Sequence, residues 1–251
     1  MNQRFAGIAA LALTFALAPH ASAKPASAPF AAALADPARP AADRDRDAAR
    51  KPGELLAFAG IKRGQRVGEW WMGGGYLTRV LAAAVGPKGH VYAFQPDEYV
   101  ARRPQSGADQ KAVDEAYANV DAVHGSMAEA AFPARLDAIV TVQNFHDLYH
   151  PPAPADFPAR AARAWFAALR PGGTLTIVDH SAVAGSGTRD SDKLHRIDKA
   201  TVLAVVTAAG FKLDGESALY ANPADPRDQT VFDPSIRGKT DQFALRFRKP
   251  K

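Results

Sequence analysis

Hydrophobic positions alternate along the chain between two kinds of run. Seven short apolar runs have the length and composition of strands, at residues 65–71, 91–95, 120–124, 136–143, 174–179, 211–220 and 242–248. Helical patterns separate most of them, at residues 77–85, 109–119, 155–169 and 199–209, and a short helix opens at residues 51–54. Strands that alternate with helices predict a parallel sheet covered on both faces. We therefore expect an α/β fold with a doubly wound, mostly parallel, seven-stranded sheet.

The last two strands differ from the others because no helical pattern lies between 211–220 and 242–248. Two strands joined without a helix can pair antiparallel. We expect them to form an antiparallel pair at one edge of the sheet.

The first 23 residues have the features of a cleavable signal peptide. Arg4 precedes an uncharged apolar stretch, residues 5–18, and the small residues at 21–23 come directly before Lys24. An uncleaved anchor is the weaker alternative, because a bilayer span needs about 20 apolar residues. We expect a periplasmic or secreted protein with no stable membrane anchor after cleavage.

The remaining chain divides into two predicted parts. Residues 24–51 are predicted to form an N-terminal linker and a charged helix, and residues 52–251 one domain. The charged run at 43–50 is interpreted as a solvated helix face, in preference to a ligand-binding segment.

Composition narrows the class of protein further. The 251 residues are 47% hydrophobic and 23% charged, which excludes a disordered chain. The net charge of +5 comes from scattered residues, so we expect a small-molecule substrate and no nucleic acid. Cysteine is absent, which excludes disulfides, thiolate zinc sites and cysteine nucleophiles. The oligomeric state is left open.

Three consecutive glycines, Gly73 to Gly75, lie between the first predicted strand and its helix. Glycines at such a turn let a ligand approach the backbone at the positive end of the helix dipole. A tight connection without a ligand is the alternative interpretation. In either case the turn lies at the carboxyl end of a strand, where sheets of this kind bind ligands.

The glycine turn belongs to an ordered set of motifs. It is followed by the strand 91–95, by His124-Gly125-Ser126-Met127, by the strand 136–140, and by Leu169-Arg170-Pro171-Gly172-Gly173. This set resembles the class I S-adenosylmethionine-dependent methyltransferase family over residues 52–249, and in detail a secreted branch of predicted methyltransferases. The resemblance implies a Rossmann-like methyltransferase fold, transferase activity, and S-adenosylmethionine as the cofactor.

The resemblance also implies which residues bind the cofactor. Glu69 matches an acidic residue that orients the methionine portion, and Gln95 stands where relatives place a carboxylate on the ribose. The other expected cofactor residues are Trp71, Gly73, Gly74, Gly75, Ser126, Met127 and Asn144. The chain departs from the family pattern at two positions: Trp71 replaces the first motif glycine, and Gln95 lacks the charge of a carboxylate.

Histidines follow the fourth and fifth predicted strands. His146 is the leading candidate for a general base, with His180 next, and Asp147 or Tyr149 could orient it. An imidazole has a pKa near 6.5, which suits proton removal from an acceptor. The alternative is that these histidines end their strands and bond to backbone carbonyls.

A metal site is a rival use of the same residues. His146 and His150 are four residues apart, and Asp179 or His180 could complete a ligand set. The two prolines at 151–152 leave little room for the regular helix that this spacing needs. No metal is therefore predicted.

Two segments outside the sheet are expected to close over the substrate. Residues 189–198 are interpreted as a lid with a helix cap at Asp198, in which His195 and Arg196 could meet an anionic substrate. The long irregular segment 222–240 is a second candidate lid.

These observations favour S-adenosylmethionine-dependent methyl transfer to a small molecule by an exported enzyme. Two other functions stay open. One is a non-catalytic small-molecule binding protein that kept the crevice, and the other is a metal-assisted hydrolase that uses the strand-end histidines.

Overall fold

The computed structural model describes residues 30–127, 132–133, 135–151 and 153–251. The predicted signal peptide, residues 1–23, and the first part of the predicted linker, residues 24–29, lie outside the described residues.

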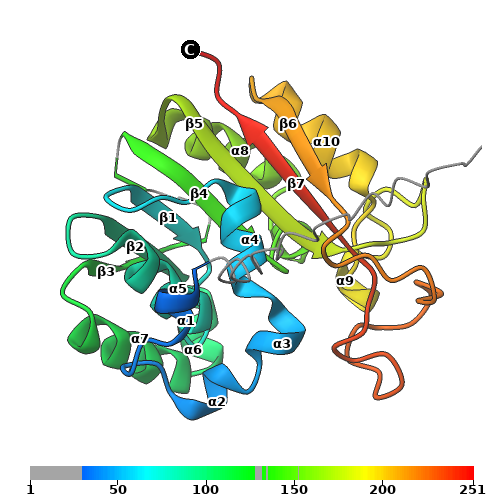
Figure 1. Ribbon diagram of the computed structural model, residues 1–251. Coiled ribbons are helices and arrows are strands. Elements are labelled where there is room, and N and C mark those ends of the chain that lie inside the picture. Colours follow the sequence, from blue (N-terminus) through cyan, green and yellow to red (C-terminus); the bar gives the residue numbers. More distant parts are fainter. Residues whose placement is uncertain (1–29, 128–131, 134, 152) are drawn as a thin grey trace, which may run out of the picture.

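A seven-stranded sheet forms the centre of the molecule (Figure 1). Its strands follow the order β3-β2-β1-β4-β5-β7-β6. The bounds are Arg66–Trp70 for β1, His90–Pro96 for β2, Val120–Gly125 for β3, Leu136–Val142 for β4, Leu169–His180 for β5, Lys212–Ser217 for β6 and Gln242–Arg248 for β7. The strands from β3 to β5 pair parallel, and β7 pairs antiparallel with both β5 and β6. The predicted fold class and the antiparallel edge pair are confirmed.

Helices cover both faces of the sheet, as the alternating pattern predicts. Figure 1 shows α4 and α5 on one face and α8 and α10 on the other. The longer helices are α4 (Pro52–Ala59), α5 (Tyr76–Val85), α6 (Asp97–Arg102), α7 (Gln105–Ala116), α8 (Phe157–Ala168) and α10 (Lys199–Ala208). The short ones are α1 (Ala31–Leu34), α2 (Ala41–Arg44), α3 (Asp47–Arg50), α9 (Ser191–Leu194) and the 3-10 helix η1 (His146–Tyr149). Each face buries its own apolar cluster, one with Leu56 and Leu81 and the other with Trp70 and Trp165.

Two elements differ from the sequence prediction. Strand β5 begins at Leu169, ahead of the predicted turn, because Gly172 and Gly173 exchange backbone hydrogen bonds with Lys249 at the end of β7. Helix α6 was not predicted, because its six residues are too few to show a helical period.

The segment 30–50 packs against the domain. Arg39 is buried and forms an ion pair of 2.6 Å with Asp47, while Asp43 pairs with Arg79 of α5 at 2.7 Å. Tyr76 donates a hydrogen bond of 2.7 Å to Asp47. These contacts hold α2 and α3 beside the beginning of α5, at the carboxyl end of β1.

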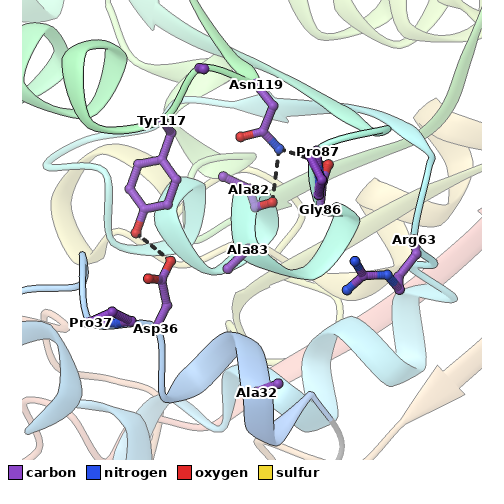
Figure 2. Close-up of a pocket in the computed structure, with 11 residues that line it drawn as sticks. Ala32, Asp36, Pro37, Arg63, Ala82, Ala83, Gly86, Pro87, Tyr117 and Asn119 are labelled. Carbon is purple, nitrogen blue, oxygen red and sulfur yellow. Dashed lines mark hydrogen bonds between the residues drawn. The ribbon is translucent and has the colours of Figure 1, made fainter.

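A cavity of about 450 Å³ lies between this segment and the far end of α5 (Figure 2). Its polar groups bond to one another. Tyr117 donates to Asp36 at 3.0 Å, and the amide of Asn119 donates to the carbonyl oxygens of Ala82 and Gly86. These groups are already satisfied, and the guanidinium of Arg63 is the charged group among the described residues of the lining that has no part in these bonds.

Within the described residues, no helix combines the length and the apolar character that a membrane crossing needs.

Candidate functional site

A large crevice, with a volume of about 1360 Å³, lies at the carboxyl ends of the central strands. Strand β1 has β2 on one side and β4 on the other, so the chain order reverses at this position. Sheets of this type bind ligands at such a switch point. The walls come from the glycine turn, η1, the segment around α9, the N-terminal helices and the segment before β7. The two predicted lids therefore both reach the crevice.

The glycine turn begins with strained backbone at Trp71. This residue has φ 72°, a left-handed conformation that glycine adopts freely and a bulky residue rarely does. Gly73 and Gly75 also have positive φ, and Gly75 is the N-cap of α5. A Cβ on Gly75 would come within 2.5 Å of Val113, so this glycine is needed for packing. Trp71, Gly73 and Gly74 line the crevice.

Two adjacent tryptophans point to different surroundings, because β1 ends at Trp70 and the backbone of Trp71 is left-handed. Trp70 is fully buried and stacks on Phe94 at a ring distance of 4.3 Å. Trp71 turns toward the crevice and contacts Tyr99 edge-on at 5.3 Å. The indole of Trp71 therefore forms part of the wall of the crevice.

Glu69 is a buried carboxyl group at the end of β1. The hydroxyl of Thr78 donates to it at 2.6 Å, and both residues lie below the glycine turn. Burial raises the pKa of Glu69 to about 7, although the Thr78 hydrogen bond and the charge of Arg79 partly oppose the shift. At neutral pH, Glu69 thus carries only part of a negative charge.

This pKa predicts a pH-dependent stability. A carboxyl whose pKa rises from about 4.5 in the unfolded chain to about 7 in the folded one holds its proton more tightly when folded. The free energy of unfolding should then fall by about 1.4 kcal/mol for each pH unit between these values, because of Glu69 alone. In Glu69→Gln that contribution disappears. Urea unfolding at pH 5, 6, 7 and 8 measures the slope.

The exposed carboxyl of Glu54 supplies the control, because Glu54→Gln should leave the slope of the native chain unchanged. If the free energy of unfolding changed with pH at the same slope in Glu69→Gln and in the native chain, Glu69 would titrate as an ordinary surface acid.

Gln95 does not face the predicted ribose site. It is fully buried at the end of β2, its Oε1 accepts from the backbone N–H of Gly73 at 3.0 Å, and its Nε2 donates to the carbonyl of Gly73 at 3.2 Å. Both ends of the amide therefore hold the glycine turn in place. Gln95 is not among the residues that line the crevice, so its predicted contact with the cofactor stays a prediction that this geometry does not favour.

Glu98, three residues later, is a carboxylate that the sequence analysis missed. It lies in the first turn of α6 and lines the crevice. The hydroxyl of Ser126 donates to one oxygen at 2.8 Å and the N–H of Met127 to the other at 2.9 Å. The pKa of Glu98 is lowered: burial raises it, but the hydrogen bonds from Met127 and Ser126 outweigh that effect.

The remaining predicted cofactor residues lie around the same opening. Met127 lines the crevice, whereas Ser126 acts through its bond to Glu98. Asn144 also lines the crevice, and its amide donates to the carbonyl of Val142 at 2.8 Å. The structure thus brings together most of the residues that the resemblance implied.

His146 of the crevice forms a buried polar pair with Asp179. Its Nδ1 lies 2.8 Å from Oδ1 of Asp179, and its backbone N–H donates to Oδ2 of the same residue at 2.8 Å. Burial lowers the pKa of His146, but the charge and hydrogen bond of Asp179 more than compensate, so the pKa lies above its usual value. Asp179, which burial alone would protonate, has a lowered pKa because His146 faces it. Asp179, and not the predicted Asp147, therefore orients the imidazole.

The other strand-end histidines have different surroundings. The Nδ1 atom of His180 is 2.8 Å from the hydroxyl of Thr240, and burial lowers its pKa to about 4. The Nε2 atom of His150 is 2.8 Å from the carbonyl of Ser191, so for this residue the backbone-bonding alternative applies. All three predicted histidines line one crevice, as expected.

A fourth histidine joins them from the predicted lid. His195 has φ 53° and places Nδ1 at 3.2 Å from Nε2 of His146. Its pKa falls to about 4, first because it is buried and then because His146 and His150 are close. Asp147 lies between these rings, and burial raises its pKa. His146, Asp147, His150 and His195 are called the histidine cluster below.

Arg196 does not reach the crevice, which corrects the expectation that it meets an anionic substrate. Its side chain is fully buried in an ion pair of 2.8 Å with Asp225, and it also donates to the carbonyl oxygens of Ser181 and Gln229. The predicted cap at Asp198 is confirmed, because its side chain accepts from the N–H of Ala200.

Positive side chains from the N-terminal segment, from the end of α6 and from the segment before β7 line the crevice. They are Arg46, Arg50, Arg102, Arg103 and Arg237. The pKa of Arg50 is lowered by burial and by the charge of Arg46, so an anion at this position would be favoured. The charged run at residues 43–50 therefore contributes to the crevice, while most of its side chains are exposed, as expected for a solvated helix face.

The comparisons with known proteins agree with this architecture. Residues 72–177, somewhat under half of the chain, match a family described as a methyltransferase domain. A comparison with curated proteins gave no significant match.

Solved structures share the fold at low sequence identity. The chain is similar to a SAM-dependent methyltransferase from Aquifex aeolicus (18% identity, 81% of this chain and 92% of that chain covered, TM-score 0.56). It is also similar to a TehB-like SAM-dependent methyltransferase from Corynebacterium glutamicum (16% identity, 84% of this chain and 96% of that chain covered, TM-score 0.54). A third similar structure is the cyclase SpnF (15% identity, 81% and 82% covered, TM-score 0.57). The domain match and the shared fold support a methyltransferase with S-adenosylmethionine as its cofactor.

Proposed function

We propose that this chain transfers a methyl group from S-adenosylmethionine to a small-molecule acceptor that binds beside His146, and that it acts outside the cytoplasm. One observation carries the proposal. A single crevice contains both the glycine turn and the buried His146–Asp179 pair, so a nucleoside and an acceptor have adjoining places within it.

The residues of the crevice fit the cofactor. Gly73 and Gly74 expose bare backbone, which allows close approach, and the carboxylate of Glu98 offers acceptor oxygens of the kind that bind ribose hydroxyls. Glu69 offers a carboxyl group for the ammonium of the methionine portion. The arginines of the N-terminal side suit its carboxylate. Glu98 therefore takes the place proposed from the sequence for Gln95.

When bound, S-adenosylmethionine supplies a methyl group on a sulfonium, which is a good leaving group. The chain then has to align the acceptor, exclude water and hold the acceptor's proton. His146 can hold that proton at Nε2, because its Nδ1–H donates to Asp179 and leaves a lone pair on the other nitrogen. Asp179 stabilises the imidazolium that results. The apolar side chains of Trp71, Val231 and Phe232 line the crevice and help to exclude water from it.

A non-catalytic binding protein is the second candidate function. It is favoured by Trp71, whose strained backbone and indole occupy the position of a family glycine, and by the use of Gln95 inside the turn. The cyclase SpnF illustrates that the name of a solved structure with this fold need not be that of a methyltransferase.

Calorimetry separates the two candidates. We expect saturable binding of both S-adenosylmethionine and its demethylated product, S-adenosylhomocysteine, to the full chain at micromolar concentrations. Glu98→Gln should weaken that binding about tenfold, because it replaces a charged acceptor by an amide. Glu115→Gln, at an exposed site on α7, is the matched control.

Absence of heat at millimolar concentrations of either nucleoside would contradict the methyltransferase proposal. Equal binding by Glu98→Gln and the native chain would contradict the ribose position alone.

The proposal of export rests on residues 1–23. If the leader is cleaved as its small residues suggest, the protein recovered from outside the cytoplasm begins at Lys24. Intact mass measurement of that protein checks this point, and a chain that retains Met1 would contradict it.

A further inference from the structure

The histidine cluster places four potential ligand atoms around one point. Nε2 of His146 lies 3.2 Å from Nδ1 of His195 and 3.4 Å from Oδ1 of Asp147. The same oxygen lies 3.2 Å from Nδ1 of His150 and 4.0 Å from Nδ1 of His195. All four atoms lie within 4.8 Å of one another.

The hydrogen bonds from the cluster to residues outside it determine which ring nitrogens carry hydrogen. Nδ1 of His146 faces a carboxylate oxygen of Asp179, and Nε2 of His150 faces the carbonyl oxygen of Ser191. Both partners are acceptors, so these nitrogens must be donors. In neutral rings, Nε2 of His146 and Nδ1 of His150 are then left with lone pairs.

Those lone pairs point toward another acceptor, the carboxylate of Asp147. Acceptors that face one another at 3.2–3.4 Å in a partly buried place are unfavourable unless a proton or a metal cation lies among them. A metal cation satisfies all of the acceptors at once.

The spacing fits a tetrahedral ion. Zinc binds imidazole nitrogen and carboxylate oxygen at about 2.0–2.2 Å, and a tetrahedron of that size has edges of about 3.4 Å. The contacts within the histidine cluster are 3.2, 3.2, 3.4 and 4.0 Å. We propose that His146, Asp147, His150 and His195 bind one divalent transition-metal ion of the zinc type.

Residues outside the cluster have the arrangement that metal sites need. Asp179 holds the ring of His146 through its far nitrogen, and Ser191 does the same for His150. Such partners orient metal-bound imidazoles. His195 reaches the cluster only because its backbone adopts φ 53°, a strained conformation of the kind found at functional sites.

The ion goes beyond the proposed function in two respects. The ion would join η1, which follows β4, to His195, which directly follows α9. It would therefore fix the predicted lid, residues 189–198, over the crevice. It also uses Nε2 of His146, the atom proposed to hold the acceptor's proton. A zinc-loaded chain therefore cannot use this imidazole as a base, and an acceptor hydroxyl near the ion would instead lose its proton more easily.

The test uses the full chain, purified without chelators. We expect elemental analysis to find about one zinc ion per chain. After chelator treatment, added Zn²⁺ should raise the melting temperature measured by circular dichroism, whereas Mg²⁺, which prefers oxygen ligands, should not. Substitution with Co²⁺ should give the visible absorption of a tetrahedral site.

Two variants locate the ion. Asp147→Asn removes the charged ligand, and His195→Asn removes an imidazole while keeping a residue that tolerates positive φ. Each should weaken zinc binding by about 100-fold or more, beyond the roughly 10- to 100-fold loss typical of outer-shell changes. His90→Asn, at the opposite end of the sheet, should bind zinc as the native chain does.

A native chain that contains no zinc and shows no shift with Zn²⁺ would overturn the proposal, as would undiminished binding by both cluster variants. These measurements need no nucleoside. Their failure would leave the methyltransferase proposal standing, and a failure to bind S-adenosylmethionine would leave the metal site standing.

Discussion

In the chain freed of metal by chelator treatment, His146→Asn is expected to lower kcat by about two to four orders of magnitude, the usual contribution of general acid–base catalysis. Asparagine can still donate from its amide to Asp179, because its nitrogen lies about where Nδ1 of histidine lies. It has no atom at the position of Nε2, which faces the crevice. The buried carboxylate thus keeps a partner while the proton acceptor is lost.

The measurement is the initial rate of S-adenosylhomocysteine release at saturating S-adenosylmethionine, with an acceptor found by screening hydroxyl- and amine-bearing small molecules. Calorimetry on the same variant should give a cofactor Kd within about threefold of the native value, because His146 lies outside the nucleoside part of the crevice. Losses of equal size in rate and in cofactor affinity would instead mean that His146 is structural.

Two further variants separate the explanations for such a loss. His90→Asn makes the same change at a histidine that pairs with Asp121 far from the crevice, and it should keep the native rate. His195→Asn removes a proposed metal ligand but leaves the His146–Asp179 pair in place. In the chain purified with its metal, a rate that falls equally in His195→Asn and His146→Asn would assign the catalytic loss to the metal ion and not to the base.

The fold could be predicted because its signals are local. Strand β4 consists mainly of buried aliphatic residues, α5 has a clear apolar face, and the glycines at 73–75 mark the connection that precedes it. Local signals also placed the antiparallel edge, since the absence of a helix before β7 is visible in the chain itself. Helix α6 is the exception, because six residues carry too little periodicity.

The site was harder to predict, because its pairings depend on side-chain direction across neighbouring strands. Asp179 is 33 positions from His146 in the chain, yet β4 and β5 lie side by side and bring the two into contact. Asp147, the nearer acid, points instead toward His150. Sequence proximity favoured the wrong carboxylate as the residue that orients the imidazole.

The same dependence on side-chain direction explains why the contacts of Gln95 and His195 could not be predicted. The position of Gln95 at the end of β2 was interpreted correctly, but nothing in the sequence shows that its amide turns back to Gly73. His195 lies in a predicted lid, where a left-handed backbone directs it toward His146. Resemblance to a family therefore located the crevice, whereas the hydrogen bonds within it had to come from the structure.

Arg196→Met should have the largest effect on stability, a loss of about 3–5 kcal/mol in the free energy of unfolding. Arg196 and Asp225 are both fully buried, so removal of the cation leaves a carboxylate without its main charged partner. Arg196 also donates to the carbonyl oxygens of Ser181 and Gln229, which ties β5 to the long segment before β7. Urea unfolding at pH 7 measures the loss.

The matched control is Arg170→Met, which makes the same substitution in an ion pair with Asp137 whose arginine is half exposed. Exposed pairs contribute about 1 kcal/mol or less, so the difference between the two variants isolates the effect of burial. Comparable losses in both variants would mean that the Arg196 pair behaves like a surface contact.

At acid pH, the difference in the free energy of unfolding between Arg196→Met and the native chain should become smaller. Burial raises the pKa of Asp225, but the hydrogen bonds and charge of Arg196, with the N–H groups of Arg227 and Asp241, lower it overall. A carboxyl with a lowered pKa adds stability above its unfolded pKa and loses that contribution as the pH falls through its folded value. In the variant, Asp225 takes up a proton more readily and so escapes the cost of an unpaired charge. Unfolding at pH 4 should therefore show a smaller loss than at pH 7, and a loss independent of pH would assign the destabilisation to packing alone.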